Sequence, residues 1–185
     1  MKKIFWYIED LMWGTKCSFN LWLHGPYGLS KVIERIPFRY LVKYLRKYGA
    51  TIGENCRFER GLNIHRPLGK QPFENLNIGN NVYLGHNTLI DLSRKILIND
   101  NVIIASRCQI WTHASTFEGD TLVNYKYSEN FGEVHIMEAA MIYSNVVITH
   151  GSIIGKFSKI GANSLVNKST EDFGFYGGVP VRRIK

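Results

Sequence analysis

The sequence predicts an all-β solenoid that follows a helical segment at the N-terminus. Branched aliphatic residues recur every six positions near the C-terminus, at Ile136, Ile142, Ile148, Ile154, Ile160 and Val166. A second residue, usually a small one, stands four positions after each of these, at Ala140, Val146, Ser152, Ser158, Ser164 and Thr170. A period of six matches neither the period of a helix, about 3.6 residues, nor the alternation of a single strand. It suits a triangular coil of three hexapeptides, in which residues about eighteen apart stack at strand spacing.

The sequence of residues 1–50 predicts a helical segment. Glu9 and Asp10 interrupt the apolar run near the start, so we expect neither a cleavable signal nor a helix that spans a membrane. A turn at Gly25-Pro26-Tyr27-Gly28 precedes Ser30, which we expect to cap the next helix.

Pro37 should kink or divide that second helix, and Gly49 should end it. Basic residues recur at every fourth position along it, at Lys31, Arg35, Arg39, Lys43 and Lys47. This spacing predicts one basic face. Either the segment caps the open end of the solenoid, or residues 1–48 lie on an anionic membrane surface, and the two interpretations are compatible.

The composition favours anionic partners. The chain has 23 Lys and Arg against 15 Asp and Glu, a formal net charge of +8. Cys17, Cys56 and Cys108 make an odd number, which we interpret as reduced core residues of a cytoplasmic protein. They show no sign of a disulfide or metal framework. The charge alone cannot choose among a nucleotide cofactor, an anionic lipid surface and nucleic acid; we expect no nucleic acid, and peripheral contact with the inner face of the membrane stays open.

The coils are expected over residues 51–172, beginning at Ile52, with a tail at 173–185. An insertion at 67–72 and a two-residue slip near Ile96 interrupt the period. A longer interruption, at 115–134, predicts a protruding loop, and loops of such length in a compact domain are usually functional.

The stretch SNVVITHGSIIGKFSKIGANSLVNKS, followed by YGGVPVRRIK, resembles the hexapeptide-repeat acyltransferases. Within them it is most similar to the sugar O-acetyltransferases of the galactoside, maltose, nodulation-factor and capsule or exopolysaccharide types. The resemblance runs from about Ile52 to the C-terminus. It implies a left-handed parallel β-helix, a handedness that the spacing itself does not show. It also implies acetyl-CoA as the co-substrate and a homotrimer with active sites between neighbouring subunits.

One column of residues follows the inward aliphatics on the third face of the coils: His65, Asp91, Trp111, Thr149 and Asn167. His113 lies two residues beyond Trp111, immediately before the long loop. The catalytic histidine of the sugar acetyltransferases has this place, so the resemblance makes His113 the general base. An acceptor hydroxyl needs such a base because it is too weak an acid to attack a thioester at neutral pH. We expect His113 at a solvent-facing corner, where its replacement would leave thermal stability unchanged.

Four residues are candidate contacts for a sugar acceptor: Tyr83, Asn87, Asp91 and Trp111. Asn87 matches an asparagine near the acceptor site of the resembled enzymes, whose acceptor-binding asparagine is replaced here by Gly85. Phenolic and acidic groups such as Tyr83 and Asp91 suit hydrogen bonding to carbohydrate, and Trp111 stands beside His113. His86, on another face, is the rival base.

The resemblance places coenzyme A along the C-terminal coils. Its expected contacts are Ser144, Gly161, Ala162, Lys168, Arg182 and Lys185, of which the three cationic residues would meet the nucleotide phosphates. A solvated basic C-terminal surface is the alternative interpretation of these charges.

The sequence thus predicts an acetyl-CoA-dependent O-acetyltransferase acting on a sugar hydroxyl of a surface-polysaccharide precursor. N-acetylation of an amino sugar or amino acid and a non-catalytic assembly protein are the alternatives. A γ-type carbonic anhydrase would need three zinc-binding histidines, two of them about five residues apart, and the histidine after His113 is His135. We therefore expect no metal.

Overall fold

The computed structural model describes residues 2–118 and 126–185. Two helices come first, α1 (Lys2–Ile33) and α2 (Phe38–Lys47). Gly25 kinks α1 through a positive φ of 64°, which glycine adopts without steric cost. Ser30 lies inside α1 and donates to the carbonyl oxygen of Pro26 at 3.0 Å, so the prediction that it caps a helix was wrong. Pro37 divides α1 from α2 as predicted.

The predicted single basic face does not exist, because Lys31 lies on α1, Arg35 in the turn after it, and Arg39, Lys43 and Lys47 on α2. Arg39 and Lys43 on α2 turn toward α1 and form ion pairs with Glu9 and Asp10. The hydroxyl of Tyr44 also donates to the carbonyl oxygen of Asp10 at 2.6 Å. These charges hold the two helices together.

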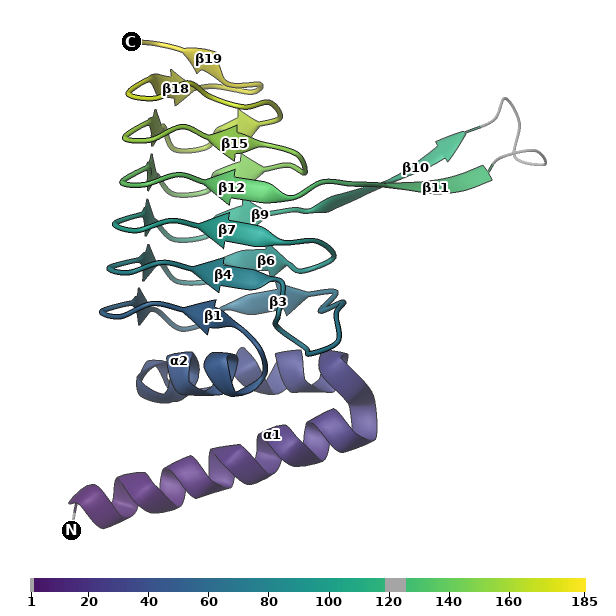
Figure 1. Cartoon of the computed structure of the whole chain (residues 1–185), viewed down its shortest axis with the longest axis vertical. Coiled ribbons are helices and arrows are strands. Elements are labelled where there is room, and N and C mark those ends of the chain that lie inside the picture. Colours follow the sequence, from purple (N-terminus) through teal and green to yellow (C-terminus); the bar gives the residue numbers. More distant parts are fainter. Residues whose placement is uncertain (1, 119–125) are drawn as a thin grey trace.

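After the helices, the chain forms coils whose strands build three parallel sheets (Figure 1). The first sheet contains β1 (Thr51–Ile52), β4 (Leu76–Ile78), β7 (Ile96–Ile98), β12 (Val134–Ile136) and β15 (Ile153–Ile154). The second contains β2 (Arg57–Phe58), β5 (Tyr83–Leu84), β8 (Ile103–Ile104), β13 (Met141–Ile142), β16 (Lys159–Ile160) and β18 (Phe175–Gly177), with β19 (Arg182–Arg183) antiparallel at its edge. The third contains β3 (Asn63–His65), β6 (Leu89–Asp91), β9 (Gln109–Ile110), β14 (Val147–Ile148) and β17 (Leu165–Val166).

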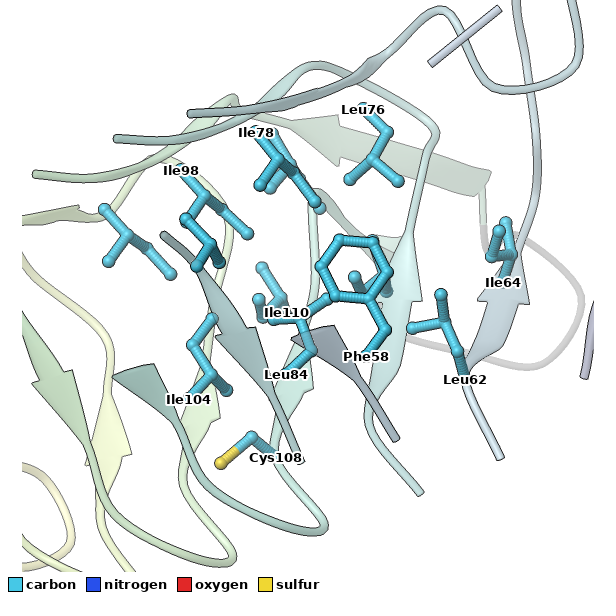
Figure 2. Packing of buried hydrophobic residues seen from close by; sticks show 14 of the residues in the cluster. Phe58, Leu62, Ile64, Leu76, Ile78, Leu84, Ile98, Ile104, Cys108 and Ile110 are labelled. Carbon is cyan, nitrogen blue, oxygen red and sulfur yellow. The ribbon is translucent and has the colours of Figure 1, made fainter. Parts of the chain in front are cut away.

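The register confirms the period read from the sequence. Ile136 pairs with Ile154, Ile142 with Ile160, and Ile148 with Val166. All six of these side chains are buried. Figure 2 shows the same arrangement in the earlier coils, where Phe58, Leu84 and Ile104 share one interior with residues of the other two sheets. Burial of this aliphatic column is the main force that stabilises such a fold.

The helices cover the N-terminal end of the coils, as the cap interpretation predicted. Leu29, Ile33, Leu41 and Leu45 are fully buried, and α1 and α2 contact the strands of the first coil. A cap of this kind removes an exposed sheet edge that would otherwise invite aggregation.

The three cysteines are free, and their burial differs. Cys17 and Cys108 are buried as expected, and burial raises the pKa of Cys17 to about 11. Cys56 is half-buried and packs against the core, with its Sγ 3.1 Å from the carbonyl oxygen of Gly79, so the prediction that it is a core residue holds only in part.

Three departures from the period leave the coils at the same corner. A loop at 66–75 follows β3, a turn at 92–95 follows β6, and the hairpin of β10 (His113–Glu118) and β11 (Lys126–Phe131) follows β9. Each segment joins a strand of the third sheet to a strand of the first sheet. Figure 1 shows them on one side of the molecule, where the hairpin projects away from the coils. The extra chain at this corner surrounds the candidate site.

Candidate active site

His113 and Asp91 form a hydrogen-bonded pair at this corner. Asp91 ends β6, and its Oδ2 lies 2.8 Å from Nδ1 of His113, the first residue of β10. The Asp91 carboxylate is 0% exposed and the His113 ring 10% exposed. Because a carboxylate accepts, Nδ1 carries the proton and Nε2 is left free to accept another.

Three further donors saturate the Asp91 carboxylate. Thr112 donates from its backbone N–H at 2.9 Å and from its hydroxyl at 2.6 Å, and Ser93 donates from its hydroxyl at 2.9 Å. Burial alone would raise the pKa of Asp91, but the hydrogen bonds from His113, Thr112 and Ser93 outweigh it and hold the pKa below the usual value. Asp91 is therefore an ionised, fixed partner for the imidazole at neutral pH.

Aromatic rings enclose His113. His65 stacks on it with ring centroids 5.6 Å apart and an interplanar angle of 15°, while the rings of Trp111 and Phe131 lie at 6.0 and 6.3 Å. Phe131 reaches this place because it pairs with His113 in the hairpin register. The expectation that His113 stands at a solvent-facing corner was wrong, since the returning strand β11 covers it.

The two-residue slip near Ile96 turns out to build the site. The extra residues lengthen the turn at 92–95, which carries Ser93 to the Asp91 carboxylate. In the same turn, the backbone N–H of Arg94 donates to the Thr112 hydroxyl at 3.0 Å, and the Arg94 guanidinium lies 4.0 Å from the Phe131 ring centroid. Sequence reasoning missed Ser93, Thr112 and Phe131, and the slip was the signal that could have located Ser93.

The hairpin is held over the corner by a charged contact from the first coil. The guanidinium of Arg66, which follows β3, donates to both carboxylate oxygens of Glu129 on β11. The Tyr127 hydroxyl donates to the same carboxylate at 2.7 Å. The hydrogen bond from Arg66, followed by that from Tyr127, lowers the pKa of Glu129 to about 2. This contact ties β11, and with it Phe131, to the coil that carries His65.

The structure brings together only part of the predicted acceptor set. Asp91 and Trp111 lie beside His113, but the Asp91 carboxylate is fully buried and bonded to His113, so it cannot contact a sugar as predicted. Tyr83 on β5 and Asn87 in the turn after it lie at the corner between the second and third sheets. A Cβ added at Gly85 would come within 2.5 Å of the backbone nitrogen of Ser106, so no side chain fits there.

Three of the predicted donor residues, Ser144, Gly161 and Ala162, lie at this other corner, whereas Lys168 follows a strand of the third sheet and lies at the corner of His113. Ser144 follows β13, and the backbone N–H of Asn163, next to Gly161 and Ala162, donates to its carbonyl oxygen at 3.1 Å. Lys168 follows β17, Arg182 lies on β19, and Lys185 ends the chain, all three exposed. One chain thus presents His113 at one corner and Ser144, Gly161 and Ala162 at another.

His65, Asp91 and His113 form a group of potential metal ligands, with ligand atoms within 4.8 Å of one another. The carbonic-anhydrase pattern expects the second histidine shortly after the first, whereas His65 comes from an earlier coil. The Asp91 carboxylate already accepts hydrogen bonds from His113, Thr112 and Ser93. A metal would have to displace these contacts, so the arrangement favours proton transfer.

The rival base, His86, lacks a comparable setting. Its ring is 54% exposed, and its Nε2 lies 3.6 Å from a carboxylate oxygen of Glu59, beyond hydrogen-bond distance. Nothing comparable to the Asp91 contact fixes its orientation in the described structure.

Comparison with known proteins identifies the repeat. Residues 133–168 match the family model of the bacterial transferase hexapeptide (six repeats). Galactoside O-acetyltransferase of Escherichia coli (strain K12) is 31% identical over 146 residues, 76% of this chain and 66% of that protein. The dTDP-3-amino-3,6-dideoxy-alpha-D-galactopyranose 3-N-acetyltransferase of Aneurinibacillus thermoaerophilus is 37% identical over 54 residues, 29% of this chain and 28% of that protein. The chain therefore spans less than two thirds of the length of these curated relatives.

A solved structure extends the similarity to three dimensions. A galactoside acetyltransferase in complex with coenzyme A superposes with a TM-score of 0.73 at 26% sequence identity. The match covers 86% of this chain and 80% of that one. The similarity in three dimensions therefore extends over most of this chain.

Proposed function

This chain is a hexapeptide-repeat protein with acetyltransferases for relatives, and from that premise we propose that it transfers acetyl from acetyl-CoA to a sugar hydroxyl of a surface-polysaccharide precursor. The observation that carries the proposal is the enclosed His113 ring, whose Nδ1 is bonded to the buried Asp91 carboxylate. The left-handed sense of the coil is part of the same proposal and follows from the resemblance.

The pair performs general-base catalysis. Nε2 of His113 takes the proton from the acceptor hydroxyl while the oxygen of that hydroxyl attacks the thioester carbonyl carbon. Asp91 stabilises the imidazolium that forms and keeps Nε2 aimed at the acceptor. A backbone N–H near Ser144 stabilises the oxyanion of the tetrahedral intermediate. Its collapse breaks the carbon–sulfur bond, and the departing thiolate recovers the proton from His113.

Direct transfer, without an acetyl-enzyme, fits the positions of the cysteines. Cys17 is buried in α1, Cys108 is buried with its Sγ near the carbonyl oxygen of Tyr143, and Cys56 lies in the first coil. Burial raises the pKa of both Cys17 and Cys108, which keeps them protonated and poorly nucleophilic.

We propose that the acceptor is contacted by residues from two corners, which belong to two neighbouring copies of the chain. Trp111 offers a ring beside His113, while Tyr83 and Asn87 would come from a neighbouring copy. N-acetylation of an amino sugar is the second candidate, favoured by the similarity to the amino-sugar N-acetyltransferase. The experiment that tests the proposed class is acceptor-dependent release of coenzyme A, measured with a thiol reagent across neutral sugars and amino sugars.

We also propose a homotrimer, because a single chain separates the base from the predicted contacts of the thioester arm. Ser144, Gly161 and Ala162 lie at the corner between the second and third sheets, and His113 lies at the corner between the third and first. Cyclic packing of identical coils places one kind of corner against the other. Lys168, Arg182 and Lys185 would then meet the phosphates of acetyl-CoA.

Mixed oligomers of two impaired variants should recover activity. His113→Asn removes the base, and Arg182→Glu, on β19 at the edge of the second sheet, weakens donor binding roughly tenfold or more for each charge-assisted hydrogen bond that is removed. If each site uses two subunits, coexpressed variants with different tags should regain roughly a quarter of parental turnover at low acetyl-CoA, because random mixing leaves that share of sites intact.

The control for this recovery is a mixture of the two variants, each purified as its own oligomer, under conditions in which subunits do not exchange. Lys70→Glu, a charge reversal in the exposed part of the 66–75 loop, controls for the change in net charge. Mixed oligomers no more active than the mean of the two variants, or a monomer with parental turnover, would refute the shared site.

A further inference from the structure

The outward face of α1 carries an apolar stripe. Their spacing places five exposed apolar residues on one face of the helix. We call this set the outer stripe: Ile4, Ile8, Leu11, Phe19 and Trp22. Ile4 is 67% exposed and Trp22 is 79% exposed. Phe5, Met12 and Leu23, beside the stripe, are exposed as well. Apolar side chains gathered in this way on a protein surface mark an interaction site.

The opposite face of α1 is already occupied. Cys17 is fully buried, Trp13 and Leu21 pack against the core, and Glu9 and Asp10 are paired with α2. In Figure 1 the first part of α1 lies on the far side of α2 from the coils. The ion pairs therefore fix the rotation of α1 and keep the outer stripe directed away from the protein.

The charges around the outer stripe are cationic. Within residues 2–34 every carboxylate is paired, since Glu9, Asp10 and Glu34 contact Arg39, Lys43 and Lys31. Lys3 and Lys16 on α1 are exposed. The surface around the stripe thus offers positive charge without an unpaired acidic group in that stretch of α1.

A hollow of about 430 Å³ opens between the outer stripe and α2. Leu11 and Phe19 line it together with Gly14, Thr15 and Ser18, and Lys47 of α2 supplies its one cation. The lining combines apolar contact with a single positive charge. Its chemistry suits an anionic amphiphile.

We propose that the outer stripe of α1 lies in the surface of an anionic lipid bilayer. The apolar side chains enter the boundary of the acyl chains, and Lys3, Lys16 and Lys47 meet the anionic headgroups. The exposed Tyr7, beside the stripe on the same helix, has the amphipathic ring that favours this depth. No helix within the described residues is long and apolar enough to cross a membrane, so the contact is peripheral.

A lipid surface fits the outer stripe better than a second copy of the same helix. If the outer stripes of two copies packed together, the lysines of both copies would come close to one another. No unpaired carboxylate of residues 2–34 could then neutralise them. The membrane-facing residues therefore differ from Arg39 and Lys43, which the sequence had suggested and which hold α1 to α2. This surface is separate from the active-site corner, so the proposal does not depend on acetyl transfer.

Sedimentation of the full chain with vesicles tests the proposal. The probes are phosphatidylcholine vesicles with and without phosphatidylglycerol. We expect the parent to bind the anionic vesicles, with affinity falling as salt rises, and Leu11→Glu/Phe19→Glu to lower that affinity by about tenfold or more. Phe173→Glu, an exposed aromatic residue at the other end of the coils, is the matched control and should bind as the parent does.

The same samples are checked by circular dichroism and light scattering. Since Leu11 and Phe19 are exposed, both variants should keep the parental secondary structure and molar mass. The proposal would be overturned if the parent did not bind anionic vesicles, or if Leu11→Glu/Phe19→Glu bound them as tightly as the parent does. A stripe variant with a smaller molar mass would instead identify a second copy as the occupant and would overturn it too.

Discussion

Replacing His113 with asparagine should lower the rate of acetyl transfer by about 100-fold to 10,000-fold, the usual size of a general-base contribution. The loss should appear in kcat, because the expected donor contacts lie at Lys168, Arg182 and Lys185 and are untouched by the change. Steady-state kinetics over a range of acetyl-CoA concentrations measures both parameters. His86→Asn, which alters an exposed ring without an orienting partner, is the matched control and should keep parental kcat.

The structure adds an effect on stability that the sequence did not predict. His113→Ala removes ring contacts with His65, Trp111 and Phe131 and takes one donor from the buried Asp91 carboxylate. Losing a charged hydrogen bond and aromatic packing should lower the melting temperature, more for alanine than for asparagine, whose amide can still donate. Retention of more than about a tenth of parental turnover by His113→Asn would mean that His113 is not the base and would direct attention to His86.

Asp91→Asn should lower kcat by about 100-fold or more although Asp91 does not touch the acceptor. An amide in place of the carboxylate removes the ionised acceptor that orients the Nδ1 proton and stabilises the imidazolium. Ser93→Ala removes only one of the four hydrogen bonds to Asp91 and should have a smaller effect.

Asp91→Asn should also change how the melting temperature depends on pH. The pKa of Asp91 is lowered from its usual value of 3.8, so the charged carboxylate stabilises the folded state fully above that pH. This contribution disappears as the pH falls through the folded-state pKa, which lies below 3.8. The gap in melting temperature between parent and Asp91→Asn should therefore be widest at neutral pH and narrow in acid. A parental kcat together with a gap independent of pH would contradict the positioning role.

The repeating part of the fold could be read from the sequence because its cause is local and periodic. Ile142 and Ile160 must both point inward once a coil takes eighteen residues, and their pairing follows directly. The same periodicity placed His65, Asp91 and Trp111 in one column, and β3 and β6 do pair His65 with Asp91. The resemblance then directed attention to His113.

The surroundings of Asp91 and His113 and the contact between the helices could not be predicted, because they depend on side chains in segments that do not follow the six-residue period. The spacing showed that Asp91 stands in the column but not that the turn at 92–95 buries its carboxylate against Ser93 and Thr112. The covering of His113 depends on how far the hairpin returns along β11, which the composition of the long loop does not encode. The pairing of Arg39 with Glu9 joins residues on different helices, and it required the turn between α1 and α2 to be known.

The most direct test of the proposed function is the chemical nature of the product formed from isotopically labelled acetyl-CoA. We expect the parent to place one labelled acetyl group on a sugar acceptor as an ester, which hydroxylamine removes, and His113→Asn to form that product at least about 100-fold more slowly. Labelled product that resists hydroxylamine would be an amide and would contradict O-acetylation, and equal rates of formation by the two proteins would contradict the role of His113.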